Sequence, residues 1–241
     1  MVETRWRGWP QVPDAPAPDR TAVWYDLSHR IHQDMWRLPI LPKPCIDKVF
    51  SMPEQPMNVT RIDMVAHLGT HVDAPRHFVV DGPTIPEVPL ERWYGPGVLW
   101  SLPVEPHEEI TAVRLDAARP YARPGDIVVL RTNWWRHFGD ELYDQHPSLA
   151  QSASDWLVDH RIKLLAIDFA TPDLAVHRRP KGFDFPAHRT LLSNGVLIAE
   201  NLTRLDQLMD GRIELMLLPI PIDGGDGAPA RIIARPQGAD R

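Results

Sequence analysis

The stretch HLGTHVDAPRH, which runs from His67 to His77, contains three of the chain's 11 histidines together with an aspartate, a glycine and a proline. Imidazole nitrogens and carboxylate oxygens are the side-chain atoms that bind Zn²⁺, Mn²⁺ and Fe²⁺ in proteins. Three unrelated structural histidines are the alternative explanation. Their density beside an aspartate favours a metal site, so the stretch predicts a metal centre.

Two backbone conformations would bring these side chains together. In a helix, His67 and His71 would share a face because they are four residues apart. In an extended chain, His67, His71 and Asp73 would all point to the same side. Gly69 and Pro75 disfavour a regular helix. We therefore predict the end of a strand that leads into a tight turn, where Gly69 would let the backbone approach the ion.

Composition limits the class of protein. The chain has 241 residues, of which 43% are hydrophobic and 24% charged, and these values are typical of one globular domain. The net charge of −6 does not favour a nucleic-acid partner, which requires a clustered basic face. The one basic cluster, HRRPK at His177–Lys181, is interpreted as a solvated loop. The alternative is that it binds an acidic substrate or contacts a neighbouring subunit.

The cellular compartment can be inferred from the cysteine content and from apolar runs. The single cysteine, Cys45, allows no intrachain disulfide and indicates a reducing compartment; we expect it to be a small buried hydrophobe. The N-terminus lacks the pattern of a signal peptide, and apolar runs such as LMLLPIPI from Leu215 are too short to span a bilayer. The expected location is cytoplasmic, without a membrane partner.

The chain divides into a Pro-rich extended arm, 1–22, and one domain, 23–241. Trp6 and Trp9 in the arm could dock on the body or on another subunit. Strand-like runs lie at 58–67, 97–104, 125–132, 163–169, 196–200, 213–220 and 230–234. Helix-like runs lie at 111–120, 147–160 and 186–195, and Thr203 is a candidate cap for a further short helix. This alternation predicts an α/β fold with a central sheet and flanking helices. No GxGxxG or P-loop motif supports nucleotide binding.

The first stretch resembles the HxGTHxDxPxH signature of the cyclase-like metal-dependent hydrolase family, to which bacterial kynurenine formamidase and isatin hydrolase belong. Every defining position matches: His67, Gly69, Thr70, His71, Asp73, Pro75 and His77. His188 in FPAHRTLL and Glu200 in LIAENL fit the family's later His and Glu, twelve residues apart. The likeness covers roughly 24–235. It implies the swivelling β/β/α fold of that family.

The resemblance also implies a ligand set. His67, His71 and Asp73 would bind one divalent metal, Asp73 would reach a second metal bound by His188, and Glu200 would bridge or complete the pair. The metal is zinc in the formamidase members and manganese in isatin hydrolase, so two ions of Zn or Mn per chain are expected.

The remaining roles also follow from the resemblance. His77 matches the residue that donates and accepts protons, and Trp36 is the candidate aromatic that stacks on the substrate. The family implies a homodimer or homotetramer with loops exchanged near the active site. Trp134 and Trp135 depart from the family pattern; they could reshape the pocket, or one could pack in the core and the other cover an interface.

The stretch AIDFATPD ends a strand with three polar side chains, Asp168, Thr171 and Asp173. A turn and a pocket rim both fit this pattern, and we favour the turn.

The main functional hypothesis is a metal-dependent hydrolase that cleaves a C–N amide bond in a small formamide or cyclic amide. The metal would activate a water molecule and His77 would transfer the proton. The substrate would be a small aromatic or carboxylated molecule. Two alternatives remain: a lactone or ester hydrolase, cyclase or dehydratase on the same metal site, and a non-catalytic metal-binding protein.

Overall fold

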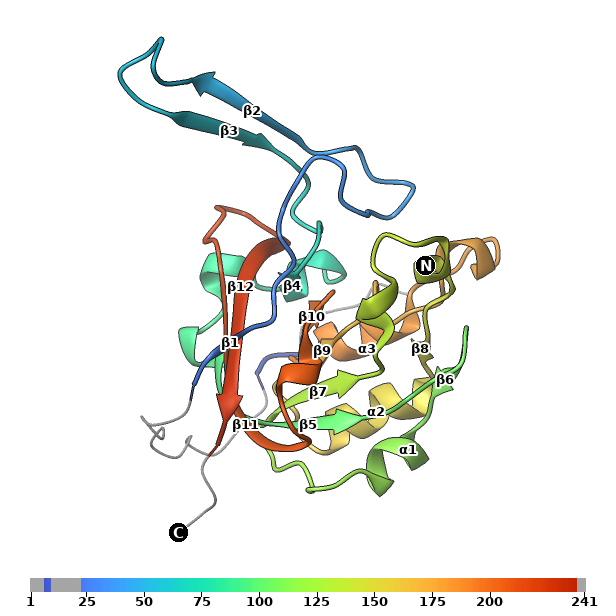
Figure 1. The fold of residues 1–241 in the computed structure, drawn as a ribbon. Helices are drawn as coiled ribbons and strands as arrows, with labels where there is room; N and C mark the ends of the chain where they lie inside the picture. Colours follow the sequence, from blue (N-terminus) through green and yellow to red (C-terminus); the bar gives the residue numbers. More distant parts are fainter. Residues whose placement is uncertain (1–6, 10–22, 238–241) are drawn as a thin grey trace.

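The computed structural model describes residues 7–9 and 23–237. Figure 1 shows one mixed α/β body and a two-stranded hairpin that projects from it. The main sheet contains, in spatial order, β1 (Tyr25–Asp26), β12 (Gly227–Pro236), β11 (Gly211–Pro219), β5 (Tyr94–Ser101), β7 (Ile127–Arg131), β9 (Leu164–Ile167), β10 (Leu197–Glu200) and β4 (His71–Asp73). Strand β4 also pairs with β12, so the strands from β12 to β4 close into a ring. The predicted α/β class is confirmed, and the closure is an addition to it.

Strands β5, β7, β9 and β10 are parallel neighbours, and each crossover between them contains a helix. The helices are α1 (Ala112–Ala117), α2 (Gln151–Asp159) and α3 (Pro186–Ser193). Strands buried on both faces require nearly continuous apolar sequence, as in IVVL of β7 and LLAI of β9. Gly97 in β5 is required by the close approach of β7, because a Cβ there would lie 2.2 Å from the Ile127 carbonyl oxygen.

The two faces of these strands belong to two separate hydrophobic cores. Val128 and Leu165 pack with the helices, whereas Val129 and Ala166 point into the interior of the ring. Trp9 packs against the interior core, with the Arg92 guanidinium 4.4 Å from its ring centre. Trp9 therefore docks on the body of the same chain, and Trp6 lies outside the described residues.

The predicted strand at 58–67 differs most from the structure. Strand β3 (Val59–Asp63) pairs with β2 (Cys45–Phe50) in the projecting hairpin, outside the main sheet. Cys45 is exposed there and contacts Asp47, so the prediction of a buried cysteine is wrong. Thr203 does not cap a helix, because the short helix in that region begins after Arg204.

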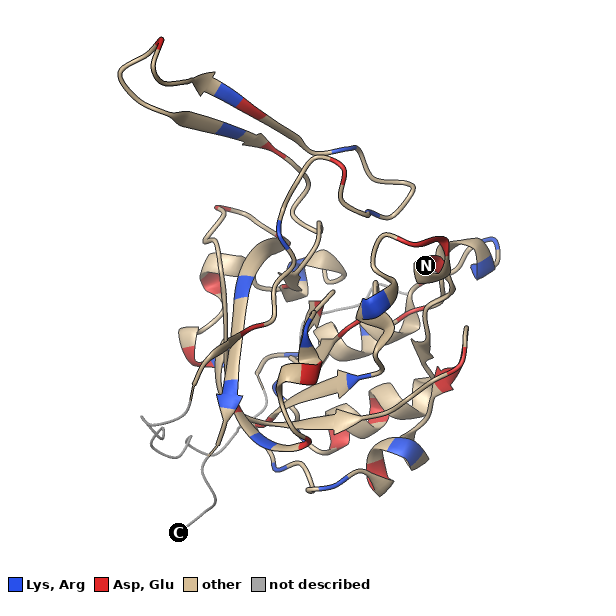
Figure 2. Cartoon of the chain, in the orientation of Figure 1, with Lys and Arg blue, Asp and Glu red and all other residues tan. Residues whose placement is uncertain are grey.

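The other elements are short. They are the paired strands β6 (Glu109–Ile110) and β8 (Ser148–Leu149), and 3-10 helices at Pro75–His77, Ile85–Glu87, Leu90–Arg92, Trp134–His137, Glu141–Gln145, Val176–Arg178 and Leu205–Gln207. In Figure 2, Lys and Arg are interspersed with Asp and Glu over the helices, strands and hairpin. Among residues 7–9 and 23–237, no helix is long and apolar enough to cross a membrane.

Candidate metal centre

The ring closes at the HLGTHVDAPRH stretch. Strand β4 lies between β10 and β12, with His71 opposite Glu200 in one register and Asp73 opposite Gly227 in the other. The 3-10 helix Pro75–His77 follows at once, so the predicted strand and turn are confirmed. Gly69 has a φ of +62°, and a Cβ there would lie 2.5 Å from Met35 Cε. The space beside Gly69 is thus occupied by the Met35 side chain.

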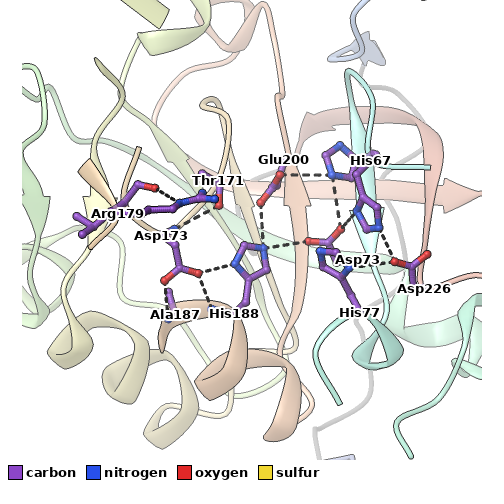
Figure 3. Close-up of polar contacts among 12 residues, drawn as sticks. His67, Asp73, His77, Thr171, Asp173, Arg179, Ala187, His188, Glu200 and Asp226 are labelled. Atoms are coloured by element: carbon purple, nitrogen blue, oxygen red, sulfur yellow. Dashed lines mark hydrogen bonds and ion pairs between the residues drawn. The ribbon is translucent and has the colours of Figure 1, made fainter. Parts of the chain in front are cut away.

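Four of the predicted ligands face one another across this closure, and Figure 3 shows three of them, Asp73, His188 and Glu200. His71 Nε2 lies 3.5 Å from Asp73 Oδ1 and 3.3 Å from Glu200 Oε2. His188 Nε2 lies 3.6 Å from Asp73 Oδ2 and 3.3 Å from Glu200 Oε1. All four side chains are buried, although they come from β4, α3 and β10.

Three of these atoms lack a hydrogen-bond partner within the part of the chain that the structure describes: His71 Nε2, Asp73 Oδ2 and Glu200 Oε1. A buried polar atom without a partner costs about 1–3 kcal/mol, so native proteins rarely retain such atoms without a compensating ligand. Two nitrogens and two carboxylates aimed at one buried space are a donor set suited to a divalent cation. The residues present therefore fit a bound metal ion.

Hydrogen bonds behind the site orient both inner imidazoles. His71 Nδ1 donates to the carbonyl oxygen of Gly69 at 2.7 Å, and His188 Nδ1 donates to Asp173 Oδ2 at 2.6 Å. Each bond directs Nε2 toward the shared space, as second-sphere partners of metal-binding histidines do. Asp173 also accepts hydrogen bonds from the backbone of Ala187 and His188 at the start of α3. The interpretation of Asp173 as a plain turn residue misses this orienting role.

The ionisation of the site follows from its mixture of charges. Burial opposes an ionised carboxylate, yet hydrogen bonds from two histidines hold the pKa of Asp73 well below its ordinary value. Burial and the nearby Asp73 charge raise the pKa of Glu200, but its histidine partners outweigh them and lower it. Burial likewise disfavours a charged His188, whose pKa its carboxylate partners raise well above the usual range. Carboxylates that stay ionised beside imidazoles provide the negative charge that a divalent cation requires.

His67 joins the cluster through a residue that sequence reasoning missed. Its Nδ1 lies 2.8 Å from Asp73 Oδ1 and its Nε2 lies 2.8 Å from Asp226 Oδ2. These bonds, acting against burial, raise the pKa of His67 to about 10. Asp226 lies in the loop before β12, and the only sequence signal for it is the position of the IDGGDGAP stretch in the part that resembles the family's end.

Asp226 also holds His77. The Asp226 Oδ2 atom lies 3.0 Å from His77 Nδ1, and the His77 ring stacks on His67 at 3.9 Å with an angle of 24°. Burial lowers the pKa of His77, although Asp226 opposes this shift. His77 Nε2 has no hydrogen-bond partner among the described residues, and the ring lines a cavity next to the cluster. Three sets of side chains have potential ligand atoms within 4.8 Å of one another: His67, His71 and Asp73; Asp73, His77 and His188; and His67, His77 and Asp226.

The cavity has a volume of about 190 Å³ and an apolar wall. Its lining includes Trp36, Leu38, Leu41, Phe78 and Phe185 around His67, His71, His77, His188 and Glu200. Trp36 packs edge-on against Tyr143, with ring centres 4.6 Å apart. The predicted Trp36 thus lies in the wall of the candidate site.

The two consecutive tryptophans lie outside this lining. Trp134 is buried in the core and its Nε1 donates to the Tyr143 carbonyl oxygen, as one of the sequence alternatives expects. Trp135 is partly buried under the Arg136 guanidinium, and its role at an interface stays a prediction.

Replacing Gly227 by alanine is expected to displace the His67 imidazole. A Cβ on Gly227 would lie 2.4 Å from His67 Cε1 and 2.9 Å from Nε2, and that ring is held from both sides by carboxylates. We expect a loss of about 10- to 100-fold in metal affinity, comparable to that from second-sphere changes. Titration of metal-free protein with Zn²⁺ measures it. Alanine at Gly139, whose Cβ would meet open space, controls for the substitution, although its positive φ adds strain. Unchanged affinity in G227A would exclude His67 as a ligand.

Comparison with known proteins places this site in a family. The model described as "Cyclase: Putative cyclase" matches residues 25–174, more than half of the chain. The chain belongs to the Cyclase family. The matched region includes the stretch His67–His77 and ends before His188 and Glu200.

Similar proteins extend the Cyclase match beyond residue 174. The chain is 28% identical over 218 residues to a kynurenine formamidase of Bacillus thuringiensis, covering 90% of this chain and 99% of the relative. A predicted metal-dependent hydrolase from Bacillus stearothermophilus superposes with a TM-score of 0.73 at 29% identity, covering 89% and 98% of the two chains. Isatin hydrolase A from Labrenzia aggregata, bound to benzyl benzoate, superposes with a TM-score of 0.80 at 23% identity, covering 90% of this chain and 94% of that one. At this identity the similarity is one of fold.

Proposed function

We propose that the chain is a metal-dependent hydrolase that cleaves a C–N amide bond in a small formamide or cyclic amide. The observation that carries the proposal is the convergence of His71 Nε2, Asp73 Oδ2 and Glu200 Oε1, which are buried without hydrogen bonds from any described residue, beside an apolar cavity. The kynurenine formamidase and metal-dependent hydrolase relatives support this reaction class. A small-molecule substrate agrees with the size of the cavity.

Five side chains would hold the metal in this proposal. His67, His71 and Asp73 would bind one ion, Asp73 and His188 would bind a second, and Glu200 would complete the pair. Nitrogen and carboxylate donors suit Zn²⁺ and Mn²⁺ alike. A bound ion supplies Lewis acidity, which polarises the substrate carbonyl and lowers the pKa of water.

The other proposed roles belong to the cavity wall. His77, held at Nδ1 by Asp226, has Nε2 available to exchange a proton with the substrate. An amide nitrogen must be protonated before it leaves, and a nearby imidazole is suited to this transfer. Trp36 presents an aromatic surface on which a planar substrate stacks.

Metal content and turnover together test the proposal. Elemental analysis of the purified chain should find about two divalent ions per chain, and hydrolysis of N-formylkynurenine should stop after chelation. Re-addition of Zn²⁺ or Mn²⁺ separately should restore it and identify the better metal. Turnover that survives complete chelation would contradict the proposal, and metal without amide turnover would favour the ester alternative. Matched amide and ester substrates of the same acid then separate those two reactions.

We also propose that the chain forms a homodimer or homotetramer. The hairpin β2–β3 extends away from the body (Figure 1). Its exposed apolar side chains are Val49, Phe50, Met52, Met57 and Ile62. Such clustering on a soluble surface marks an association site. Light scattering at micromolar concentration should give at least twice the mass of one chain, 27.4 kDa, and a monomer would contradict the proposal.

A cytoplasmic location is part of the same proposal. The only cysteine, Cys45, is an exposed free thiol, which agrees with a reducing compartment. Fractionation of cells that express the tagged chain tests it.

A further inference from the structure

Arg179 belongs to the HRRPK cluster but differs from its neighbour Arg178. The 3-10 helix Val176–Arg178 leaves Arg178 exposed, whereas Arg179 is partly buried and lines the cavity beside the metal cluster. In Figure 3, Arg179 lies on the Asp173 side of His188, at the opposite end of the cluster from Asp226. The solvated loop expected from the sequence is thus correct for Arg178 and wrong for Arg179.

The Arg179 guanidinium is held in place but keeps free donors. Its Nε donates to the Leu174 carbonyl oxygen at 2.8 Å, and its plane lies 4.7 Å from the ring centre of Phe185. The two Nη atoms have no hydrogen-bond or ion-pair partner among the described residues. Asp173 and Glu200 are the carboxylates whose charges act on Arg179, but Asp173 accepts a hydrogen bond from His188 Nδ1 and Glu200 forms an ion pair with His188 Nε2.

A partly buried cation without a directly paired carboxylate is unfavourable, and burial lowers the pKa of Arg179 even though the charges of Asp173 and Glu200 oppose this shift. The paired Nη donors of arginine match the two oxygens of a carboxylate in a bidentate pair. The rest of the wall is apolar and aromatic. An apolar cavity of about 150 Å³ accepts a benzene ring. The volume here, about 190 Å³, therefore suits one ring and a few further atoms.

We infer that Arg179 is the residue of this cavity that selects the substrate by binding its carboxylate. The aromatic wall accepts the ring, Arg179 binds the anion at one end, and the metal cluster receives the amide. This inference rests on the proposed function for the reaction, but the recognition of an anion is a property of the cavity alone. Arg179 is a specificity residue and takes no part in bond cleavage.

Binding of a matched acid and amide tests the inference separately from turnover. Benzoate and benzamide have the same shape and differ in charge, and neither contains the formamide bond. Calorimetry on the full-length, metal-loaded protein should show tighter binding of benzoate. R179Q should lose about 10- to 100-fold in benzoate affinity, the value of a charged hydrogen bond, while its benzamide affinity stays within about twofold.

Three variants serve as controls. R178Q changes a neighbouring exposed arginine and should bind both ligands like the wild type. R179K keeps the positive charge but lacks the paired Nη donors, so it should retain part of the preference for benzoate over benzamide. R37Q removes the other arginine of the cavity wall, whose Nε donates to Leu41. A wild type without preference, or an R179Q that keeps it, overturns the inference, as does a preference lost only in R37Q.

Kinetics on 3-formamidobenzoate and 3-formamidobenzamide add a second measurement. R179Q should raise KM for the acid with little change in kcat, because the lost contact exists before and during the reaction. Absence of turnover on both compounds with the benzoate preference intact would reject the proposed reaction and leave anion recognition standing. Turnover without a preference for benzoate over benzamide would support the proposed reaction and reject anion recognition by Arg179.

Discussion

Asparagine in place of Asp73 is expected to remove the bound metal and to lower amide hydrolysis by at least about 10³-fold. Asp73 is the residue that three imidazoles share: its oxygens lie 2.8 Å from His67, 3.5 Å from His71 and 3.6 Å from His188. The substitution keeps the size of the side chain but removes the negative charge that would offset the charge of the proposed ions. Elemental analysis and turnover on the same preparation measure both losses.

The exposed Asp47 of the hairpin provides the matched control for Asp73. D47N should keep full metal content and activity, because the polar contacts of its carboxylate with described residues are those to Cys45 and Arg61 in the projecting hairpin. Circular dichroism establishes that D73N is folded. Wild-type metal content in folded D73N would remove Asp73 from the ligand set and with it the shared position between the two proposed ions.

Asparagine in place of His77 is expected to lower kcat on an amide by about 10²- to 10⁴-fold while metal content stays that of the wild type. The imidazole faces the cavity and is held by Asp226, so its removal would take away the proposed proton donor for the leaving amine. An aryl ester of the same acid has a leaving group that departs without a proton. The loss on the ester should therefore be much smaller than the loss on the amide.

The ratio of these two losses separates two roles for His77. Its ring nitrogen also groups with ligand atoms of Asp73 and His188. If H77N lowers metal content in parallel with turnover, and affects amide and ester equally, His77 is a metal ligand and the proton transfer belongs to another residue. Asp226→Asn should also lower turnover on the amide more than on the ester, because it loosens the His77 ring without removing it.

Local sequence was sufficient for several features of the molecule. The IVVL and LLAI runs predict strands buried on both faces, because such strands have no polar face to present to water. The glycine and proline of the HLGTHVDAPRH stretch disfavour a regular helix and predict the strand and turn that are observed. The types of side chain at His67, His71 and Asp73 predict metal chemistry, because imidazole and carboxylate are the donors that divalent ions accept.

Sequence spacing gives no account of the partners that arrive from distant segments. Asp226 and Asp173 have ordinary surroundings of turn residues, and they become orienting groups only because β12 closes on β4 and α3 begins beside the loop after β9. Likewise, Arg178 and Arg179 are adjacent in sequence, and the end of a 3-10 helix decides which of them lines the cavity.

The amino-acid sequence alone therefore specifies the chemistry that this chain can perform, through residue types and local spacing within one strand and turn. The closure of the ring decides how side chains from different elements are oriented. It determines which buried atoms face one another, which carboxylate holds His77, and which arginine lines the cavity. The physical reason is that hydrophobic patterning selects each element and its buried face locally, whereas contacts between elements 100 or more residues apart, such as the His67–Asp226 pair at a separation of 159, exist only after the sheet has paired.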